Sequence, residues 1–247
     1  LDPEEILSLS KMDYMERAVF ILRRFLDDYT DEELAECVKG AYGSGRFDAA
    51  GIAPVVKLSE NAYMLELWHG PTCAFKDVAL QLLPRLIVKA NMKTNENCET
   101  VILVATSGDT GKAALEGFRD VKGTRIIVFF PDEGVSKVQK MQMVTQEGTN
   151  VHVVGVKGNF DDTQNGVKAI FSDEELGRAM LGNGYKFSSA NSINWGRLVP
   201  QIVYYFSAYA DMVAAGEIAA GEKINITVPT GNFGNILASW YAREMGL

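Results

Sequence analysis

Hydrophobic residues recur with the spacing of a helix near the start of the chain. Within residues 12–29 the apolar positions share one helical face: Met15, Ala18, Val19, Leu22 and Phe25 or Leu26. This spacing predicts an amphipathic helix. A second helix is predicted after Thr30, because Thr30 and Glu33 form a capping-box pattern and a glycine ends the run that follows. Residues 1–55 are therefore expected to form an N-terminal helical segment.

A different pattern follows, in which short runs are rich in apolar and β-branched residues. These runs are Val101–Ala105, Ile126–Phe130, Val151–Val156 and Ile224–Val228. Helix-like segments, Gly111–Arg119 and Val138–Glu147, separate the first three. Continuous apolar strands that alternate with helices predict an α/β fold with a parallel sheet covered on both faces. A repeat protein is excluded because the intervening segments are not alike.

The composition narrows the class of protein. The chain has 247 residues, of which 47% are hydrophobic and 23% charged, as expected of a globular protein with two lobes. The net charge of -8 argues against nucleic-acid and membrane-surface partners. Three cysteines without C-x-x-C spacing and two histidines predict no metal site. No apolar run reaches the roughly 20 residues of a membrane span. The chain begins at Leu1 without a methionine, so we expect its native start to be missing. Since no signal peptide is visible, we expect the protein to be cytoplasmic.

Lys76 is unusual because it stands between a Gly-Pro-Thr turn and a long apolar run. Apolar residues after Lys76 recur at helical spacing, which places Lys76 at the start of a helix that packs on the core. Pro84 is expected to kink this helix. Burial and the positive end of the helix dipole both favour a neutral amine there. A neutral amine can form a Schiff base with an aldehyde. The alternative is a lysine whose ammonium group reaches solvent along its stem.

Two polar loops follow predicted strands, where α/β proteins carry their chemistry. In "PTGNFGN" (Pro229–Asn235), Gly231 to Asn235 could hold a phosphate with backbone N–H groups, or form a plain turn. In "TSGDTG" (Thr106–Gly111) the amides and hydroxyl groups suit a carboxylate or phosphate, and Asp109 could instead cap a helix. Neither loop has a nucleotide-binding pattern. An amine nucleophile with two anion loops indicates pyridoxal phosphate chemistry.

Four segments resemble, in the same order, the motifs of the threonine synthases, which are pyridoxal-phosphate enzymes of fold type II. They are "HGPTCAFKDVALQ" (His69–Gln81), "TSGDTG", "SSANSINWGR" (Ser188–Arg197) and "PTGNFGN". The resemblance implies a fold like that of the tryptophan synthase β subunit. It implies a large cofactor-binding domain formed by residues 56–98 and 186–247, and a smaller α/β domain at 99–185.

The resemblance also implies roles for individual residues. Lys76 would carry pyridoxal 5'-phosphate as a Schiff base and act as the catalytic base, and Asp109 would lie near the hydroxyl group of the cofactor ring. The cofactor phosphate would be bound by Gly231, Asn232, Phe233, Gly234 and Asn235. The substrate, O-phospho-L-homoserine, would be bound by Ser107, Thr110, Asn191, Ser192 and Arg197. A dianionic substrate in an acidic protein needs a local cation, and Arg197 offers a bidentate one.

The implied reaction is the conversion of O-phospho-L-homoserine and water to L-threonine and phosphate. Two alternatives stay open: a phospholyase that releases 2-oxobutyrate and phosphate, and a non-catalytic relative that binds a ligand. The family continues well beyond Leu247, and its partner for the cofactor's pyridine nitrogen lies in that part. We therefore expect this chain to be a fragment. His69, next to the Gly-Pro turn, could act as an acid or base, but a structural hydrogen bond suits its place better.

Overall fold

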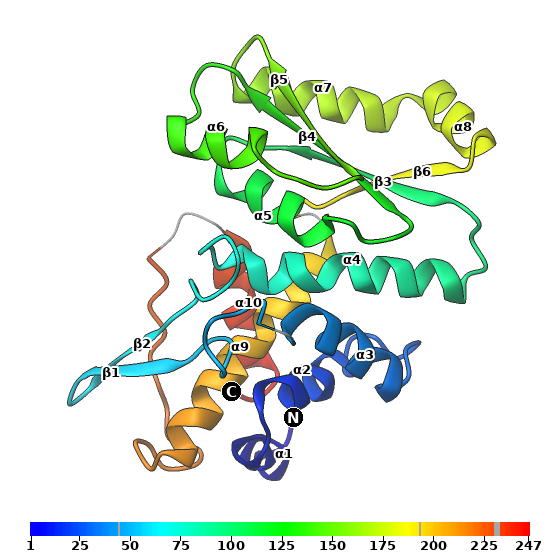
Figure 1. Cartoon of the computed structure of the whole chain (residues 1–247). Coiled ribbons are helices and arrows are strands. Elements are labelled where there is room, and N and C mark those ends of the chain that lie inside the picture. Colours follow the sequence, from blue (N-terminus) through cyan, green and yellow to red (C-terminus); the bar gives the residue numbers. More distant parts are fainter. Residues whose placement is uncertain (44, 193, 230–232) are drawn as a thin grey trace. The chain divides into compact units, whose positions relative to one another are not determined.

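The computed structural model describes residues 1–43, 45–192, 194–229 and 233–247 (Figure 1). The chain divides into two compact units. Unit 1 contains residues 1–79 and 195–247, and unit 2 contains residues 80–194. The division of the chain at residues 55, 98 and 185 that the sequence suggests stays a prediction.

Unit 1 is built mainly from helices. They are α1 (Pro3–Ser8), the short 3-10 helix η1 (Leu9–Lys11), α2 (Tyr14–Leu22), α3 (Asp31–Tyr42), the first turn of α4 (Lys76–Lys93), α9 (Trp195–Ala214) and α10 (Phe233–Glu244). The capping box predicted at α3 is confirmed, since the Glu33 N–H donates to Thr30 Oγ1 over 3.2 Å and the Thr30 N–H donates to the Glu33 carboxylate over 3.0 Å. Both α2 and α10 pack against α9, which is buried along most of its length.

The buried face of α2 differs from the predicted one. Its buried residues are Tyr14, Arg17, Ala18, Ile21 and Leu22, whereas Met15 and Val19 are only half-buried. The helix ends at Leu22, so Phe25 and Leu26 lie beyond it. The apolar pattern missed this face because it treats an arginine as exposed.

Among the described residues of unit 1, the two strands form a single hairpin. Strands β1 (Val55–Ser59) and β2 (Ala62–Leu65) pair antiparallel, which the sequence did not predict. The predicted strand at Ile224–Val228 is wrong, because these residues are irregular and mostly exposed. A strand is held by the backbone hydrogen bonds of a neighbour, and none pairs with residues 224–228 in the described part of the chain.

Unit 2 contains the predicted parallel sheet. Its strand order is β5 (Val151–Val156), β4 (Thr124–Pro131), β3 (Glu99–Ala105) and β6 (Tyr185–Ser189), and every neighbouring pair is parallel. Three of these strands confirm the predicted apolar runs. Strand β6 was missed because its sequence, YKFSS, carries three polar residues and resembles no apolar run.

Helices cover both faces of this sheet, as predicted. Along β3 the side chains of Ile102 and Val104 pack with α4, α5 (Asp109–Phe118) and α6 (Lys137–Val144), in one apolar cluster. Those of Val101 and Leu103 face α7 (Phe160–Ser172) and α8 (Glu174–Gly182). Figure 1 shows α5 on one side of the sheet and α7 on the other. The alternation follows from the period of two in a strand.

Candidate functional site

Lys76 is the first residue of α4 and is only 6% exposed, as the sequence predicts for a lysine directed inward. Its Nζ lies 4.6 Å from the centre of the Phe75 ring. The first turn of α4 is held to α3, because the Tyr42 hydroxyl donates to the Val78 carbonyl over 2.9 Å. The amine therefore projects from a helix start that is anchored to its neighbour.

The segment before Lys76 is made of two tight turns. The Cys73 N–H donates to the Gly70 carbonyl over 3.0 Å, and the Asp77 N–H donates to the Ala74 carbonyl over 2.9 Å. The Asp77 carboxylate is fully buried and accepts from the Thr72 N–H at 2.8 Å and from the Thr72 hydroxyl at 2.6 Å. These bonds give residues 70–77 one defined shape.

His69 lies between two carboxylates. Its Nδ1 is 2.6 Å from Asp48 Oδ1 and its Nε2 is 2.7 Å from Glu66 Oε2. The hydrogen bond to Glu66, and next the one to Asp48, raise the pKa of His69 above its ordinary value. The expectation of a structural hydrogen bond at His69 is confirmed.

The start of α10 follows the glycine-bearing loop. Gly231 and Asn232 lie outside the described residues. Phe233 opens the helix and is 70% exposed. Asn235 is buried, and its Oδ1 accepts from the hydroxyl groups of Tyr204 and Tyr205, the latter at 2.7 Å. Burial raises the pKa of Tyr205 to about 12, so its hydroxyl remains a donor. The side-chain oxygen of Asn235 is thus bound to α9, a role that the sequence did not predict.

Arg197 is also more enclosed than its predicted role suggests. It is the third residue of α9 and is 2% exposed. Its backbone carbonyl accepts from Gln201 Nε2 at 2.7 Å. The assignment of Arg197 to a substrate phosphate stays a prediction.

In unit 2 two of the segments that resemble the family's motifs, "TSGDTG" and the start of "SSANSINWGR", lie at one edge of the sheet. Ser107, Asp109 and Thr110 follow β3, and Asn191 and Ser192 follow β6, its parallel neighbour. Strands β4 and β5 lie on the other side of β3, so β3 and β6 flank a switch point, where α/β proteins bind ligands. The Asn191 side chain donates to the Ala105 carbonyl over 3.4 Å and so joins the two strand ends.

Within the first of these loops, Thr106 has a role that the sequence left open. Its hydroxyl oxygen accepts from the N–H groups of Gly108 and Gly111, both at 3.1 Å, and Thr106 itself is buried. Two amides offered as anion donors are therefore already bonded within the loop. Ser107 and Asp109 are exposed and Thr110 is half-buried.

The helix-cap alternative for Asp109 is wrong. Helix α5 begins at Asp109 and its N-cap is Gly108. Asp109 lies in the first turn, where the helix dipole favours a carboxylate without the N-cap bond.

Other kinds of site are not found in the described residues. No group of three or more His, Cys, Asp or Glu residues in that part of the chain could hold a metal ion. Its helices include none with the length and apolar character that crossing a membrane requires. All three cysteines are free thiols.

Comparison with known proteins shows which proteins this chain is similar to. No family model matches the chain. It is 43% identical to the threonine synthase of Pseudomonas aeruginosa over 245 residues, which are 99% of this chain and 49% of that protein. It is 45% identical to human threonine synthase-like 1 over 248 residues, which are 97% of this chain and 33% of that protein. The structure of a PLP-bound threonine synthase from Brucella melitensis matches with a TM-score of 0.88 and 41% identity, covering 100% of this chain and 50% of that one.

The parallel sheet flanked by helices is the α/β fold of fold type II. Within that class, the chain is homologous to the threonine synthases along its whole length. It spans between a third and a half of the length of these relatives, as the resemblance of its motifs led us to expect.

Proposed function

We propose that the chain is part of a PLP-dependent threonine synthase, which converts O-phospho-L-homoserine and water to L-threonine and phosphate in threonine biosynthesis. The observation that carries the proposal is the buried amine of Lys76 at the start of α4. The homology to threonine synthases supports the same reaction. The proposal includes the cytoplasmic location expected from the sequence.

The residues present fit the cofactor. Bound PLP supplies an aldehyde for a lysine and a ring that withdraws electrons from the substrate. Lys76 offers an amine in an enclosed place, beside an aromatic ring. The first turn of α10 offers N–H groups without helical acceptors, which suit a phosphate. Since the Asn235 side-chain oxygen is bound to tyrosines, we assign its backbone N–H to the phosphate, beside those of Phe233 and Gly234.

The other proposed cofactor contacts come from loops. Gly231 and Asn232 would add N–H groups for the cofactor phosphate, and Asp109 would lie near the ring hydroxyl. Asp109 is exposed at the carboxyl edge of β3, where a ligand can reach it.

The proposed substrate contacts use the remaining residues. Ser107 and Ser192 present exposed side chains at the β3–β6 edge, and Thr110 is half-buried beside them in sequence. Asn191 is held at the same edge by its bond to Ala105. Arg197 would pair with the substrate phosphate.

The amine of Lys76 would take the proton from the substrate α-carbon and return protons at the β-carbon, while phosphate leaves the γ-carbon and water adds at the β-carbon.

Replacement of Lys76 tests the proposal. The complete protein is incubated with PLP and O-phospho-L-homoserine, and phosphate, threonine and 2-oxobutyrate are followed together. We expect threonine to match phosphate. Lys76→Ala should abolish turnover and the borohydride fixation of PLP to the protein, because both are proposed to need the Lys76 amine. Lys93→Ala, which removes an exposed lysine of the same helix, should leave both intact.

The other outcomes identify the alternatives. Phosphate matched by 2-oxobutyrate would make the protein a phospholyase with the same site. Absence of phosphate release would favour a ligand-binding relative. Turnover by the Lys76→Ala protein would remove the assignment of Lys76.

A further inference from the structure

We infer that Asp77 and Thr72 are positioning residues that aim the amine of Lys76. The inference rests on the proposed role of Lys76 and concerns residues that have no assigned part in the chemistry. The starting observation is the buried Asp77 carboxyl group, which follows Lys76 and is hydrogen-bonded to the loop that precedes Lys76.

The Asp77 carboxylate needs donors because it is removed from water. Its side chain is fully buried, and a buried carboxylate is costly unless it is hydrogen-bonded. Thr72 provides its backbone N–H at 2.8 Å and its hydroxyl at 2.6 Å, and the Ala74 N–H lies farther away at 3.4 Å. These donors precede Lys76 in the chain. The carboxylate therefore reaches back past Lys76 and ties the helix start to the preceding loop.

Packing leaves this arrangement little freedom. A Cβ at Gly70 would lie 2.5 Å from Asp77 Cβ and 2.6 Å from its Oδ2, so the backbone at Gly70 rests directly on the carboxylate. Cys73 adopts φ +55, a left-handed conformation that costs energy in a residue with a side chain. Such a conformation persists where the surroundings determine it. The loop is thus held in one shape by contacts that converge on Asp77.

The direction of Lys76 follows from that of Asp77. Consecutive side chains on a helix point about 100° apart, so a fixed Asp77 also fixes the direction in which Lys76 leaves the helix. Val78, the next residue, is held from α3 by the Tyr42 hydroxyl. Two adjacent residues after Lys76 are therefore anchored, one to its own loop and one to another helix. A displacement of about 1 Å in a reacting group can cost about 100-fold in rate.

Matched substitutions in the complete protein test the inference. Thr72→Val removes the hydroxyl donor, Thr72→Ser keeps it, and Asp77→Asn keeps the side-chain shape but loses the charge and one acceptor. We expect Thr72→Val and Asp77→Asn to lower kcat by about 100-fold while KM changes by less than about threefold. Thr72→Ser should keep the parent's kcat.

Two further readouts do not depend on turnover. One is the rate at which borohydride fixes PLP on Lys76, located by mass spectrometry, and the other is hydrogen exchange at the Thr72 amide without PLP. Thr72→Val and Asp77→Asn should slow the fixation, and Asp77→Asn should speed the exchange.

Each result decides for or against the inference. A Thr72→Val protein that melts at a lower temperature but matches Thr72→Ser in kcat and fixation rate would show a structural role only and overturn it. If Asp77→Asn does not fold, the two Thr72 variants decide alone. If the parent protein makes no threonine, the proposed function fails, but the positioning role is still tested by the fixation of PLP on Lys76. Equal fixation rates in the two Thr72 variants would overturn the positioning role.

Discussion

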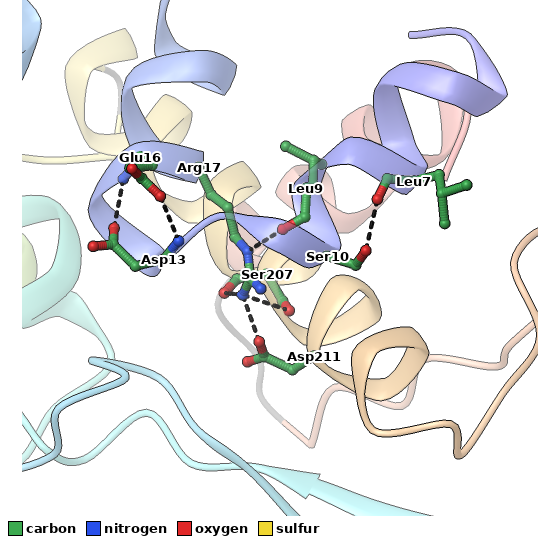
Figure 2. Close-up of polar contacts among 8 residues, drawn as sticks. All are labelled: Leu7, Leu9, Ser10, Asp13, Glu16, Arg17, Ser207 and Asp211. Atoms are coloured by element: carbon green, nitrogen blue, oxygen red, sulfur yellow. Dashed lines mark hydrogen bonds and ion pairs between the residues drawn. The ribbon is translucent and has the colours of Figure 1, made fainter.

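Arg17 is a buried cation that joins three segments of unit 1 (Figure 2). Its Nε donates to the Leu9 carbonyl over 2.8 Å, and its Nη1 donates to the Ser207 hydroxyl over 2.8 Å and to the Asp211 carboxylate over 2.5 Å. One side chain therefore fastens η1 and α2 to α9. Such a residue contributes to stability through its partners, because each of them would lose a bond without it.

Removal of this cation should destabilise unit 1. We expect Arg17→Leu to lower the free energy of unfolding by about 2 kcal/mol, because it leaves the Leu9 carbonyl and the Ser207 hydroxyl of two buried residues without their donor. Arg23→Leu is the control: Arg23 forms an exposed ion pair with Asp31, and its loss should cost under about 1 kcal/mol. Urea unfolding of the parent and both variants measures the difference. Equal costs would show that burial does not set the contribution of these arginines.

His69 should make stability depend on pH. Its pKa is raised in the folded protein by Glu66 and Asp48, whereas in the unfolded chain it is about 6.5. Folding therefore favours the protonated ring. The stabilisation is complete below about pH 6.5 and is lost as the pH rises through the raised pKa of the folded state.

The melting temperatures of the parent and of His69→Gln test this expectation over a pH series. Their difference should be largest on the acidic side, where imidazolium bonds to both carboxylates, and should shrink as the pH rises. A difference that is constant with pH would mean that the ring acts only through its shape.

At the scale of elements, α4 and α5 approach closely where a proline interrupts the α4 hydrogen bonds. Pro84 has no N–H, so the Leu80 carbonyl loses its helical donor. Gly117 of α5 lies directly against that carbonyl, since a Cβ at this glycine would be 2.0 Å from the Leu80 oxygen. The Gly117 Cα–H thus points at the open carbonyl, a weak contact that only glycine permits.

Substitution of this glycine should force the two helices apart. We expect Gly117→Ala to destabilise the protein by about 3 kcal/mol, the upper range for overpacking. Gly166→Ala in α7 is the matched control, because a Cβ at Gly166 meets no atom within 4 Å. It should be neutral or stabilise by up to about 1 kcal/mol, since alanine favours the helix. Thermal unfolding of both variants checks the opposite signs, and two similar shifts would contradict the close contact.

The sequence predicted elements well where local pattern and packing agree. The capping box at Thr30, the start of α4 at Lys76 and three parallel strands are confirmed. Strand β6 was missed because its polar residues pair with β3 only through long-range hydrogen bonds. Residues 224–228 have the composition of a strand but no partner strand in the described chain.

At the candidate site, too, features set by local pattern were predicted, whereas several side-chain hydrogen bonds were not. A lone lysine before an apolar run predicted the inward position of Lys76 at a helix start, since burial of a helix face is a local pattern. The bonds from Thr72 to Asp77, from Thr106 to the glycine amides and from the tyrosines to Asn235 were not predicted. They depend on side-chain directions that spacing alone does not give. The sequence therefore suggests candidate residues for the chemistry and leaves open which residues hold them in place.

For the whole molecule, the proposed residues divide between the two units. Unit 1 contains Lys76, Arg197 and the start of α10, and unit 2 contains the two loops at the β3–β6 edge. Unit 2 is one continuous stretch of chain, whereas unit 1 is assembled from two stretches that all of unit 2 separates.

This path of the chain has a consequence for synthesis on the ribosome, which proceeds from the N-terminus. Unit 2 can complete its sheet from neighbouring segments as soon as β6 has emerged. Helices α1 and α2 must wait for α9 before their packing is complete, since both pack against α9 and the bond from Arg17 to Asp211 spans 194 positions of sequence. These helices are therefore made before unit 2 but complete their packing after it, and their apolar faces remain open to chaperones and to other nascent chains while unit 2 is synthesised.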